Sequence, residues 1–184
     1  MLSNDCLGHG SLYWITGLSG SGKTTLARLL IARLRELGRP CLLLDGDELR
    51  GVLNRQQAYD RETRLDLALT YSRLCQLALG QGLDVVCATV SLFHACQAWN
   101  REHIANYIEI LIEVPDAVLH ERDQKGLYSC AQAGLITDVM GVDLIPEWPL
   151  KPDLVLYNNG TRTPEQMFND LLINLKLSNL NLEA

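Results

Sequence analysis

A glycine-rich stretch near the start of the sequence constrains the fold more than any other feature. Residues 17–24 read Gly-Leu-Ser-Gly-Ser-Gly-Lys-Thr, which matches the pattern GxxxxGK[ST]. An apolar run precedes it at residues 12–16, and an amphipathic stretch follows it at residues 23–37. Such glycines let successive backbone N–H groups converge on phosphate oxygens at the start of a helix, where the helix dipole also favours an anion. The motif therefore predicts a strand, a phosphate-binding loop and a helix, as in α/β P-loop proteins.

The individual residues of this motif have expected roles in binding ATP. The Lys23 ammonium should reach the β- and γ-phosphates, and the Thr24 hydroxyl should bind Mg²⁺. The loop and the first helical turn should hold the nucleotide, and they comprise Gly17, Leu18, Ser19, Gly20, Ser21, Gly22, Lys23, Thr24 and Thr25. The alternative is a glycine-rich turn without a ligand, against which the flanking strand and helix argue.

Short apolar runs alternate with longer helical periods along the rest of the chain. Strands are expected at residues 12–16, 41–45, 84–89, 107–114 and 153–157, and helices at 23–37 and 61–79. A last helix should begin at Thr163, whose side chain would form a capping box with Gln166. This pattern predicts an α/β three-layer sandwich with a mostly parallel sheet, formed by one P-loop kinase domain over residues 1–184. Residues 124–151 show little periodicity and contain several glycines and prolines, as expected for a lid segment.

Two carboxylates follow the second expected strand, at Asp45 and Asp47. The carboxyl end of a parallel strand faces the crevice in which ligands bind. Beside a phosphate-binding loop, Asp45 could bind Mg²⁺ and Asp47 could accept a proton from a hydroxyl. Arg50 follows about one helical turn later and could hold an anion through two hydrogen bonds. A solvated Asp-Gly turn with an ordinary surface arginine is the alternative interpretation.

The charge balance argues against several classes of partner. The chain has 16 Lys and Arg against 22 Asp and Glu, a net charge of −6, which disfavours nucleic acid and anionic membranes. It has no apolar run of about 18 residues, and its first residues lack the basic start and apolar stretch of a signal peptide. Six cysteines without CxxC or zinc-ligand spacing are typical of reduced thiols, with a redox pair as the alternative. We therefore expect a cytoplasmic protein that acts on a small anionic molecule.

Several further motifs resemble those of the adenylylsulfate kinase family. The segments are Gly17-Leu-Ser-Gly-Ser-Gly-Lys-Thr-Thr25, Leu44-Asp-Gly-Asp-Glu-Leu-Arg50 with Leu53 and Asn54, Arg122-Asp-Gln-Lys-Gly-Leu-Tyr128, Gly141-Val-Asp143, Glu147, Pro149 and Pro152. The resemblance extends from Tyr13 to the last expected strand. It implies that a homodimer transfers the γ-phosphate of ATP to the 3′-hydroxyl of adenylylsulfate, a small-molecule nucleotide acceptor.

The resemblance also implies roles for individual residues. Asp47 corresponds to the catalytic acid near the substrate hydroxyl, and Lys125 can neutralise charge on the transferred phosphoryl group. Ser91 corresponds to a serine described as phosphorylated, although direct transfer needs no phosphoserine. The implied catalytic set is Lys23, Asp47, Ser91 and Lys125. The acceptor would be held by Asp47, Arg50, Tyr59, Arg64, Val90, Ser91, Lys125, Gly126, Leu127 and Val139, while Arg122 would join the ATP site and Asp45 would join Thr24 at the metal.

The acceptor half of this pattern departs from the family. Leu67 and Val139 stand where the family has an asparagine and a phenylalanine that stacks on the adenine, and Ser91-Leu-Phe-His94 replaces Ser-Pro-Tyr-Arg. The stretch Trp99-Asn-Arg101 with Asn106-Tyr107 is similar to adenylylsulfate-kinase-like proteins of surface-polysaccharide pathways. Two alternatives therefore stand beside adenylylsulfate. One is the same transfer to another activated nucleotide, such as cytidine diphosphoramidate. The other is a non-catalytic nucleotide-binding regulator.

Overall fold

Five parallel strands form the sheet in the computed structural model, which describes residues 10–55, 60–123 and 126–177. The strands are β1 (Leu12–Thr16), β2 (Cys41–Asp45), β3 (Asp84–Ala88), β4 (Tyr107–Glu113) and β5 (Leu154–Tyr157). Their order across the sheet is β2-β3-β1-β4-β5, and every neighbouring pair is parallel. These strands match the five expected from the sequence to within one residue at each end, so the predicted α/β fold with a parallel sheet is confirmed.

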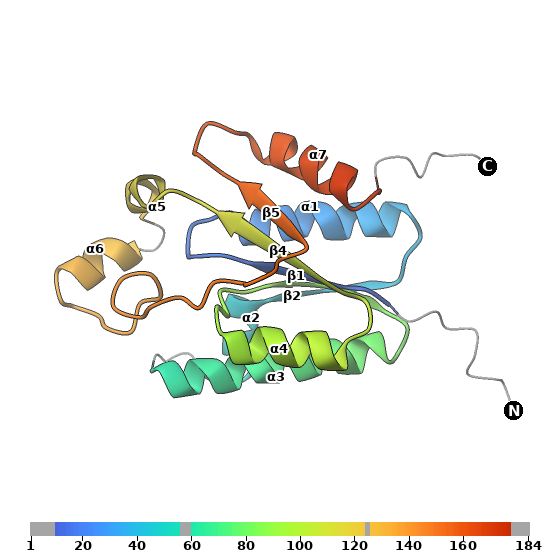
Figure 1. The fold of residues 1–184 in the computed structure, drawn as a ribbon, viewed down its shortest axis with the longest axis horizontal. Coiled ribbons are helices and arrows are strands. Elements are labelled where there is room, and N and C mark those ends of the chain that lie inside the picture. The colour runs from blue at the N-terminus through green and yellow to red at the C-terminus, as the bar shows by residue number, and fades with distance from the viewer. Residues whose placement is uncertain (1–9, 56–59, 124–125, 178–184) are drawn as a thin grey trace, which may run out of the picture.

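Helices cover both faces of the sheet (Figure 1). In the described residues they are α1 (Lys23–Glu36), α2 (Gly46–Val52), α3 (Arg61–Leu79), α4 (His94–His103), α5 (Asp116–Arg122), α6 (Leu127–Gln132) and α7 (Pro164–Asn174). Helices α1 and α7 pack on one face, and α3 and α4 pack on the other, which gives the expected three layers. Thr163 caps α7 through the predicted capping box with Gln166.

Four of these helices are absent from the sequence-based prediction. The helices α2, α4, α5 and α6 contain 7, 10, 7 and 6 residues, too few for a period of 3.6 to stand out. Because α6 lies within residues 124–151, that segment is more ordered than its lack of periodicity suggested. Likewise, Gly46 and Asp47 do not form a turn after β2, since they are the first residues of α2.

The central strands are buried because helices cover both of their faces. Every residue of β1 is buried. Leu12 and Trp14 belong to the apolar cluster formed with α3 and α4, whereas Tyr13 and Ile15 belong to the cluster formed with α1 and α7. Burial on both faces explains why the strands appear in the sequence as continuous apolar runs rather than alternating patterns.

A polar cluster lies toward the edge of the sheet at which the strands begin. The Glu109 side chain on β4 is 1% exposed and accepts hydrogen bonds from Arg101 Nη2 and from the Tyr107 hydroxyl, each at 2.9 Å. Asp153 accepts a bond of 2.8 Å from the backbone N–H of Glu109 and also contacts Arg101. Burial raises the pKa of Glu109, although Tyr107 and Arg101 oppose that rise. The cluster fastens α4 and the residue before β5 to β4.

None of the helices in residues 10–55, 60–123 and 126–177 is long and apolar enough to cross a membrane. The cysteines in this part of the chain are Cys41, Cys75, Cys87, Cys96 and Cys130, and all of them are free thiols. Burial raises the pKa of the Cys96 thiol to about 12, so this side chain stays neutral at physiological pH. Cys6 lies outside the described residues.

Candidate active site

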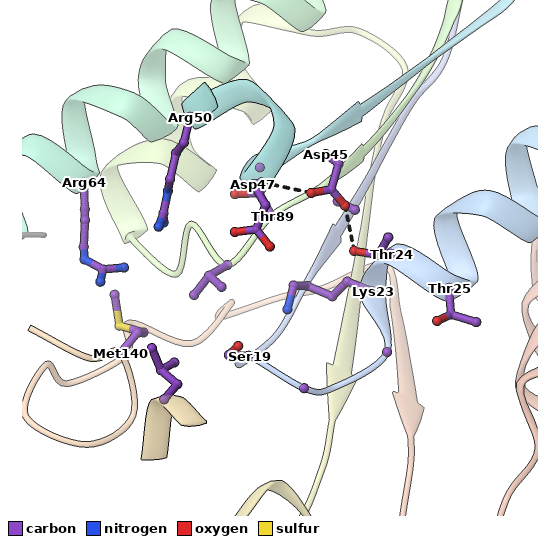
Figure 2. A pocket seen from close by; sticks show the side chains of 16 residues that line it. Ser19, Lys23, Thr24, Thr25, Asp45, Asp47, Arg50, Arg64, Thr89 and Met140 are labelled. Carbon is purple, nitrogen blue, oxygen red and sulfur yellow. Dashed lines mark hydrogen bonds between the residues drawn. The ribbon is translucent and has the colours of Figure 1, made fainter. Parts of the chain in front are cut away.

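The carboxyl ends of the parallel strands meet at one edge of the sheet, where a cavity of about 240 Å³ lies (Figure 2). The P-loop (residues 17–22) follows β1, α2 follows β2 and residues 89–93 follow β3. Side chains from all three segments line the cavity, as do Leu127 and Met140 from the expected lid. The topology therefore brings together most of the residues selected from the sequence.

The backbone of the P-loop depends on glycine where the chain leaves β1. Gly17 has a φ of +147°, and a Cβ atom there would lie 2.6 Å from the carbonyl oxygen of Ile112 in the neighbouring strand. A side chain at this position would force β1 and β4 apart. Gly22, with a φ of +102°, then precedes the first turn of α1, whose residues Lys23, Thr24 and Thr25 line the cavity.

Lys23 and Thr24 lie on the P-loop side of the cavity, as the motif predicts. Lys23 Nζ donates a hydrogen bond of 2.7 Å to the carbonyl of Leu18, so the ammonium lies within the loop that would receive phosphate. Thr24 Oγ1 donates a bond of 2.6 Å to Asp45 Oδ2, and Asp45 Oδ1 accepts a bond of 2.9 Å from the backbone N–H of Asp47. Asp45 thus caps α2, and the Thr24 hydroxyl lies beside the Asp45 carboxylate. These hard oxygen donors are of the kind that Mg²⁺ prefers.

Two arginines lie across the cavity from Lys23 (Figure 2). Arg50 comes from α2 and Arg64 from α3, and both line the cavity with Asp47. Arg64 Nη2 donates a bond of 2.6 Å to the carbonyl of Asp138, which ties α3 to the expected lid. Arg50 Nε is buried without a hydrogen-bond partner among the described residues, and a buried cationic donor of this kind suits an anion. The cavity therefore has the P-loop lysine on one wall and two arginines on the opposite wall.

A smaller cavity adjoins the arginine wall and shares Arg50, Arg64, Thr89, Val90 and Met140 with the first. It is completed by Leu67, Tyr71, Ser91 and Phe93. The Ser91 hydroxyl lies 2.8 Å from that of Thr89. Val139, expected to contact the acceptor, is 2% exposed and lines neither cavity, and the adjacent Met140 lines both. The structure thus places Val90, Ser91 and Leu67 together but does not place Val139 with them.

A further cavity, of about 270 Å³, lies on the other side of the P-loop. Arg122 lines it, as expected for a residue of the ATP site, and its Nη1 donates a bond of 2.9 Å to the carbonyl of Gly20. Asn158 and Arg162 line the same cavity and were not selected from the sequence. Their only signal was their position directly after the last strand, at the carboxyl edge of the sheet.

Glu147 joins the expected lid to the rest of the molecule. Its carboxylate accepts a hydrogen bond of 2.6 Å from the backbone N–H of His94, the first residue of α4, and forms an ion pair with Arg61 at the start of α3. Its backbone N–H donates a bond of 3.0 Å to the carbonyl of Leu92. Partial burial raises the pKa of Glu147, but the bonds from His94 and Arg61 outweigh that effect and lower it. The residue therefore holds the loop that carries Ser91 and Phe93.

Two residues expected at the acceptor site, Tyr59 and Lys125, lie outside the described residues. Gly126, expected at the acceptor, precedes α6 with a φ of +64°, and Leu127 follows it into the main cavity.

A P-loop with its lysine and threonine, a buried aspartate beside that threonine and two arginines across the cavity define a small-molecule P-loop kinase. Residues 9–157 match the family model described as "Adenylylsulphate kinase". The chain belongs to this family.

Known members of the family are similar over nearly the whole chain. A Campylobacter jejuni protein named cytidine diphosphoramidate kinase is 39% identical over 90% of this chain and 96% of its own. An adenylyl-sulfate kinase of Clostridium kluyveri is 35% identical over 89% of this chain and 82% of its own. The Mycobacterium tuberculosis APS kinase CysC, solved with AMPPNP and APS, superimposes with a TM-score of 0.83 at 31% identity, covering 91% of this chain and 98% of the other. A hexameric APS kinase from Thiobacillus denitrificans shares the fold, with a TM-score of 0.65 at 24% identity, over 91% of this chain and 29% of its own.

Proposed function

We propose that this protein is an ATP-dependent kinase that phosphorylates the 3′-hydroxyl of an activated nucleotide. The observation that carries the proposal is the two-sided cavity, with Lys23 and Thr24 on the donor wall and Arg50 and Arg64 on the acceptor wall. A protein that only bound a nucleotide would need the first wall alone.

The residues of the chain would divide the reaction between them. The P-loop N–H groups and Lys23 would bind the β- and γ-phosphates, while Thr24 and Asp45 would hold Mg²⁺, which offsets phosphate charge when bound. Asp47 would accept the proton of the acceptor hydroxyl as its oxygen bonds to the γ-phosphorus and the bond to ADP breaks. Arg50 and Arg64 would hold the anionic part of the acceptor. The resemblance to the family assigns Lys125 the role of offsetting charge on the phosphoryl group. Ser91 would line the acceptor site.

Two acceptors follow from family membership, adenylylsulfate and cytidine diphosphoramidate. The sequence favours the first, but the acceptor end of the cavity favours the second. Leu67 lines that end where the family has an amide, and Val139 is buried rather than presenting a ring to a purine. Loss of a stacking ring weakens base binding by about 1–3 kcal/mol, which matters more for a purine than for a smaller pyrimidine. The Campylobacter relative named for the cytidine compound supports the same choice.

The experiment is acceptor-dependent ADP release with ATP and Mg²⁺, in which the two acceptors are compared side by side and Lys23→Ala is the blank. Turnover with cytidine diphosphoramidate alone supports the second acceptor, and strong turnover with adenylylsulfate restores the first. Leu67→Asn should improve use of adenylylsulfate if the cytidine compound is the acceptor. Val139→Phe is a poor companion because a larger side chain at a buried site costs about 1–3 kcal/mol by overpacking. Nucleotide binding without release of ADP from ATP in the presence of either acceptor would favour the regulator.

We also propose that the chain forms one domain whose residues 124–151 act as a lid, and that it associates with itself. The lid is supported by Leu127 and Met140, which line the cavity, and by the bond from Arg64 to the carbonyl of Asp138. Large apolar side chains are exposed on it and on β5, namely Leu135, Ile145, Leu150, Val155 and Tyr157. A homodimer would cover such side chains, and sedimentation equilibrium tests it. Free thiols and a need for ATP suit the cytoplasm.

A further inference from the structure

Four consecutive carbonyl groups of the P-loop each accept a hydrogen bond from a side chain. The Leu18 carbonyl accepts from Lys23, as described above. The Ser19 carbonyl accepts from the Tyr128 hydroxyl at 2.9 Å, and the Gly20 carbonyl accepts from Arg122 Nη1 at 2.9 Å. The Ser21 carbonyl accepts from Asn158 Nδ2 at 3.2 Å. Three of the four donors come from parts of the chain more than 100 residues away, so this arrangement is a property of the fold and not of the motif.

The direction of these carbonyls matters because it sets the direction of the N–H groups. In a planar trans peptide the C=O of one residue and the N–H of the next point in opposite directions. Carbonyls of Ser19 and Ser21 that are bonded to Tyr128 and Asn158 therefore leave the N–H groups of Gly20 and Gly22 turned the other way. Gly20 and Gly22 both line the main cavity, and both also line the cavity on the other side of the loop. The hydrogen bonds from Tyr128 and Asn158 thus fix the orientation of these peptide groups between the two cavities.

Asn158 is itself fixed from several sides. Its side chain is buried, and its Oδ1 accepts bonds from Arg122 Nη2 at 3.3 Å and from the backbone N–H of Gly160 at 3.2 Å. Its own backbone N–H donates a bond of 2.8 Å to the carbonyl of Glu113 at the end of β4. Asn158 therefore acts on the loop directly at Ser21 and indirectly by orienting Arg122 toward Gly20.

Tyr128 connects the same loop to the segment over the cavity. It is 2% exposed within α6, and its backbone N–H donates a bond of 2.8 Å to Asp123 Oδ1. Burial raises the pKa of the Tyr128 hydroxyl to about 12, so the hydroxyl keeps its proton and remains a donor at physiological pH. A displacement of α6 would break the bond to Ser19.

We propose that Tyr128 and Asn158 are positioning residues that hold the P-loop ready for triphosphate, and that Tyr128 makes this readiness depend on where α6 lies. The inference rests on the proposed function only in that the P-loop binds the phosphate donor. It rests on the bond that each side chain makes to the loop backbone, and Asn158 also lines the cavity beside Arg122.

The test is binding of β,γ-imido ATP with Mg²⁺, measured by calorimetry without any acceptor. Tyr128→Phe removes one hydroxyl and should weaken binding about fivefold, the effect of one typical hydrogen bond. Asn158→Asp keeps the acceptor oxygen toward Arg122 and Gly160 but replaces the donor toward Ser21, and should weaken binding about tenfold because two oxygens then face each other. The matched control is Tyr13→Phe, since the buried Tyr13 hydroxyl on β1 is bonded to Arg39 and not to the P-loop. It should bind as the wild type does.

A second probe separates positioning from other roles. Inorganic tripolyphosphate has no base or ribose, so each variant should lose affinity for it by the same factor as for the nucleotide. Equal binding of nucleotide by Tyr128→Phe and wild type would overturn the inference, and so would a loss confined to the nucleotide, which would place the effect at the base. With an active acceptor, KM for ATP should rise while KM for the acceptor stays unchanged. If the wild type binds nucleotide but forms no ADP from ATP with either acceptor, the proposed function fails and this inference stands.

Discussion

Replacing Glu147 should destabilise the protein by an amount that can be worked out from its contacts. Helix α4 begins after Phe93, whose side chain cannot cap it, and the Glu147 carboxylate accepts the first N–H of the helix instead. Loss of such a cap in Glu147→Ala costs about 1 kcal/mol. Loss of a negative charge at a helix N-terminus adds about 0.5 kcal/mol. The ion pair with Arg61, whose side chain is 55% exposed, adds at most about 0.5 kcal/mol because solvent screens it.

The sum, about 2 kcal/mol, should lower Tm by about 4–8 °C in a domain of this size. Glu147→Gln keeps an acceptor oxygen and should lose about half as much, because charge-assisted bonds are roughly twice as strong as neutral ones. The pKa of Glu147 is lowered in the folded state, so the stabilisation that depends on its charge is present above the unfolded pKa. It is lost as the pH falls through the lower, folded pKa. The difference in the free energy of unfolding between wild type and Glu147→Gln should therefore be constant near neutral pH. It should disappear in acid, where Glu147 is protonated.

The assay is urea unfolding followed by circular dichroism, near pH 7 and again in acid at about pH 3. Glu121→Ala, on the exposed surface of α5, is the matched control and should unfold as the wild type does. A free energy of unfolding for Glu147→Ala within about 0.5 kcal/mol of wild type would refute the capping argument, since this is the range of ordinary surface substitutions. A difference between wild type and Glu147→Gln that persists in acid would refute the electrostatic part.

Three other substitutions or treatments have expected outcomes. Lys23→Ala should lower the rate of ADP release by roughly 10²–10³, as for loss of one preorganised charge-stabilising group, with the unfolding transition unchanged; a rate near wild type would remove Lys23 from catalysis. Asp45→Asn should keep the cap of α2, with a free energy of unfolding within about 0.5 kcal/mol of wild type, whereas Asp45→Ala should lower it by about 1 kcal/mol. Both variants should need more Mg²⁺ for the same rate. Equal stability of the two variants would contradict the capping role. A thiol reagent at about pH 8 should modify Cys41 and Cys130 well before Cys75, Cys87 and Cys96 in the native protein, because the last three side chains are buried and burial also raises the pKa of Cys96 to about 12. Mass spectrometry of the modified chain checks the order.

The parts of the fold that the sequence predicts are those with a local cause. The P-loop follows from its glycines and lysine, and the central strands follow from apolar runs that are buried on both faces. The edge strands β2 and β5 are only partly buried, but their apolar runs also mark them in the sequence. The capping box at Thr163 is likewise contained within four residues. In contrast, the contacts from Tyr128 to Ser19 and from Asn158 to Ser21 join residues 109 and 137 positions apart, and no local pattern marks them.

The acceptor site shows a second limit of sequence reasoning. A family resemblance aligned Val139 with an aromatic residue of the acceptor site, but Val139 precedes a turn in which its carbonyl accepts hydrogen bonds from Val142 and Leu144. Val139 is buried, and Met140 lines the cavity instead. The stretch from Trp99 to Tyr107, which suggested a different acceptor, contributes Arg101 and Tyr107 to the polar cluster around Glu109 at the other end of the sheet. No residue of this stretch lines any of the three cavities described above.

The two ends of the segment over the cavity are fastened to different halves of the molecule. Near its start, Tyr128 is bonded to the P-loop, and near its finish Glu147 is bonded to α3 and α4. Because both ends of the segment are bonded, its middle can move outward most easily. It cannot swing open on a single hinge unless one of these contacts breaks. Molecules would then pass beneath its central portion, where Asp138 and Met140 meet Arg64 and the cavity.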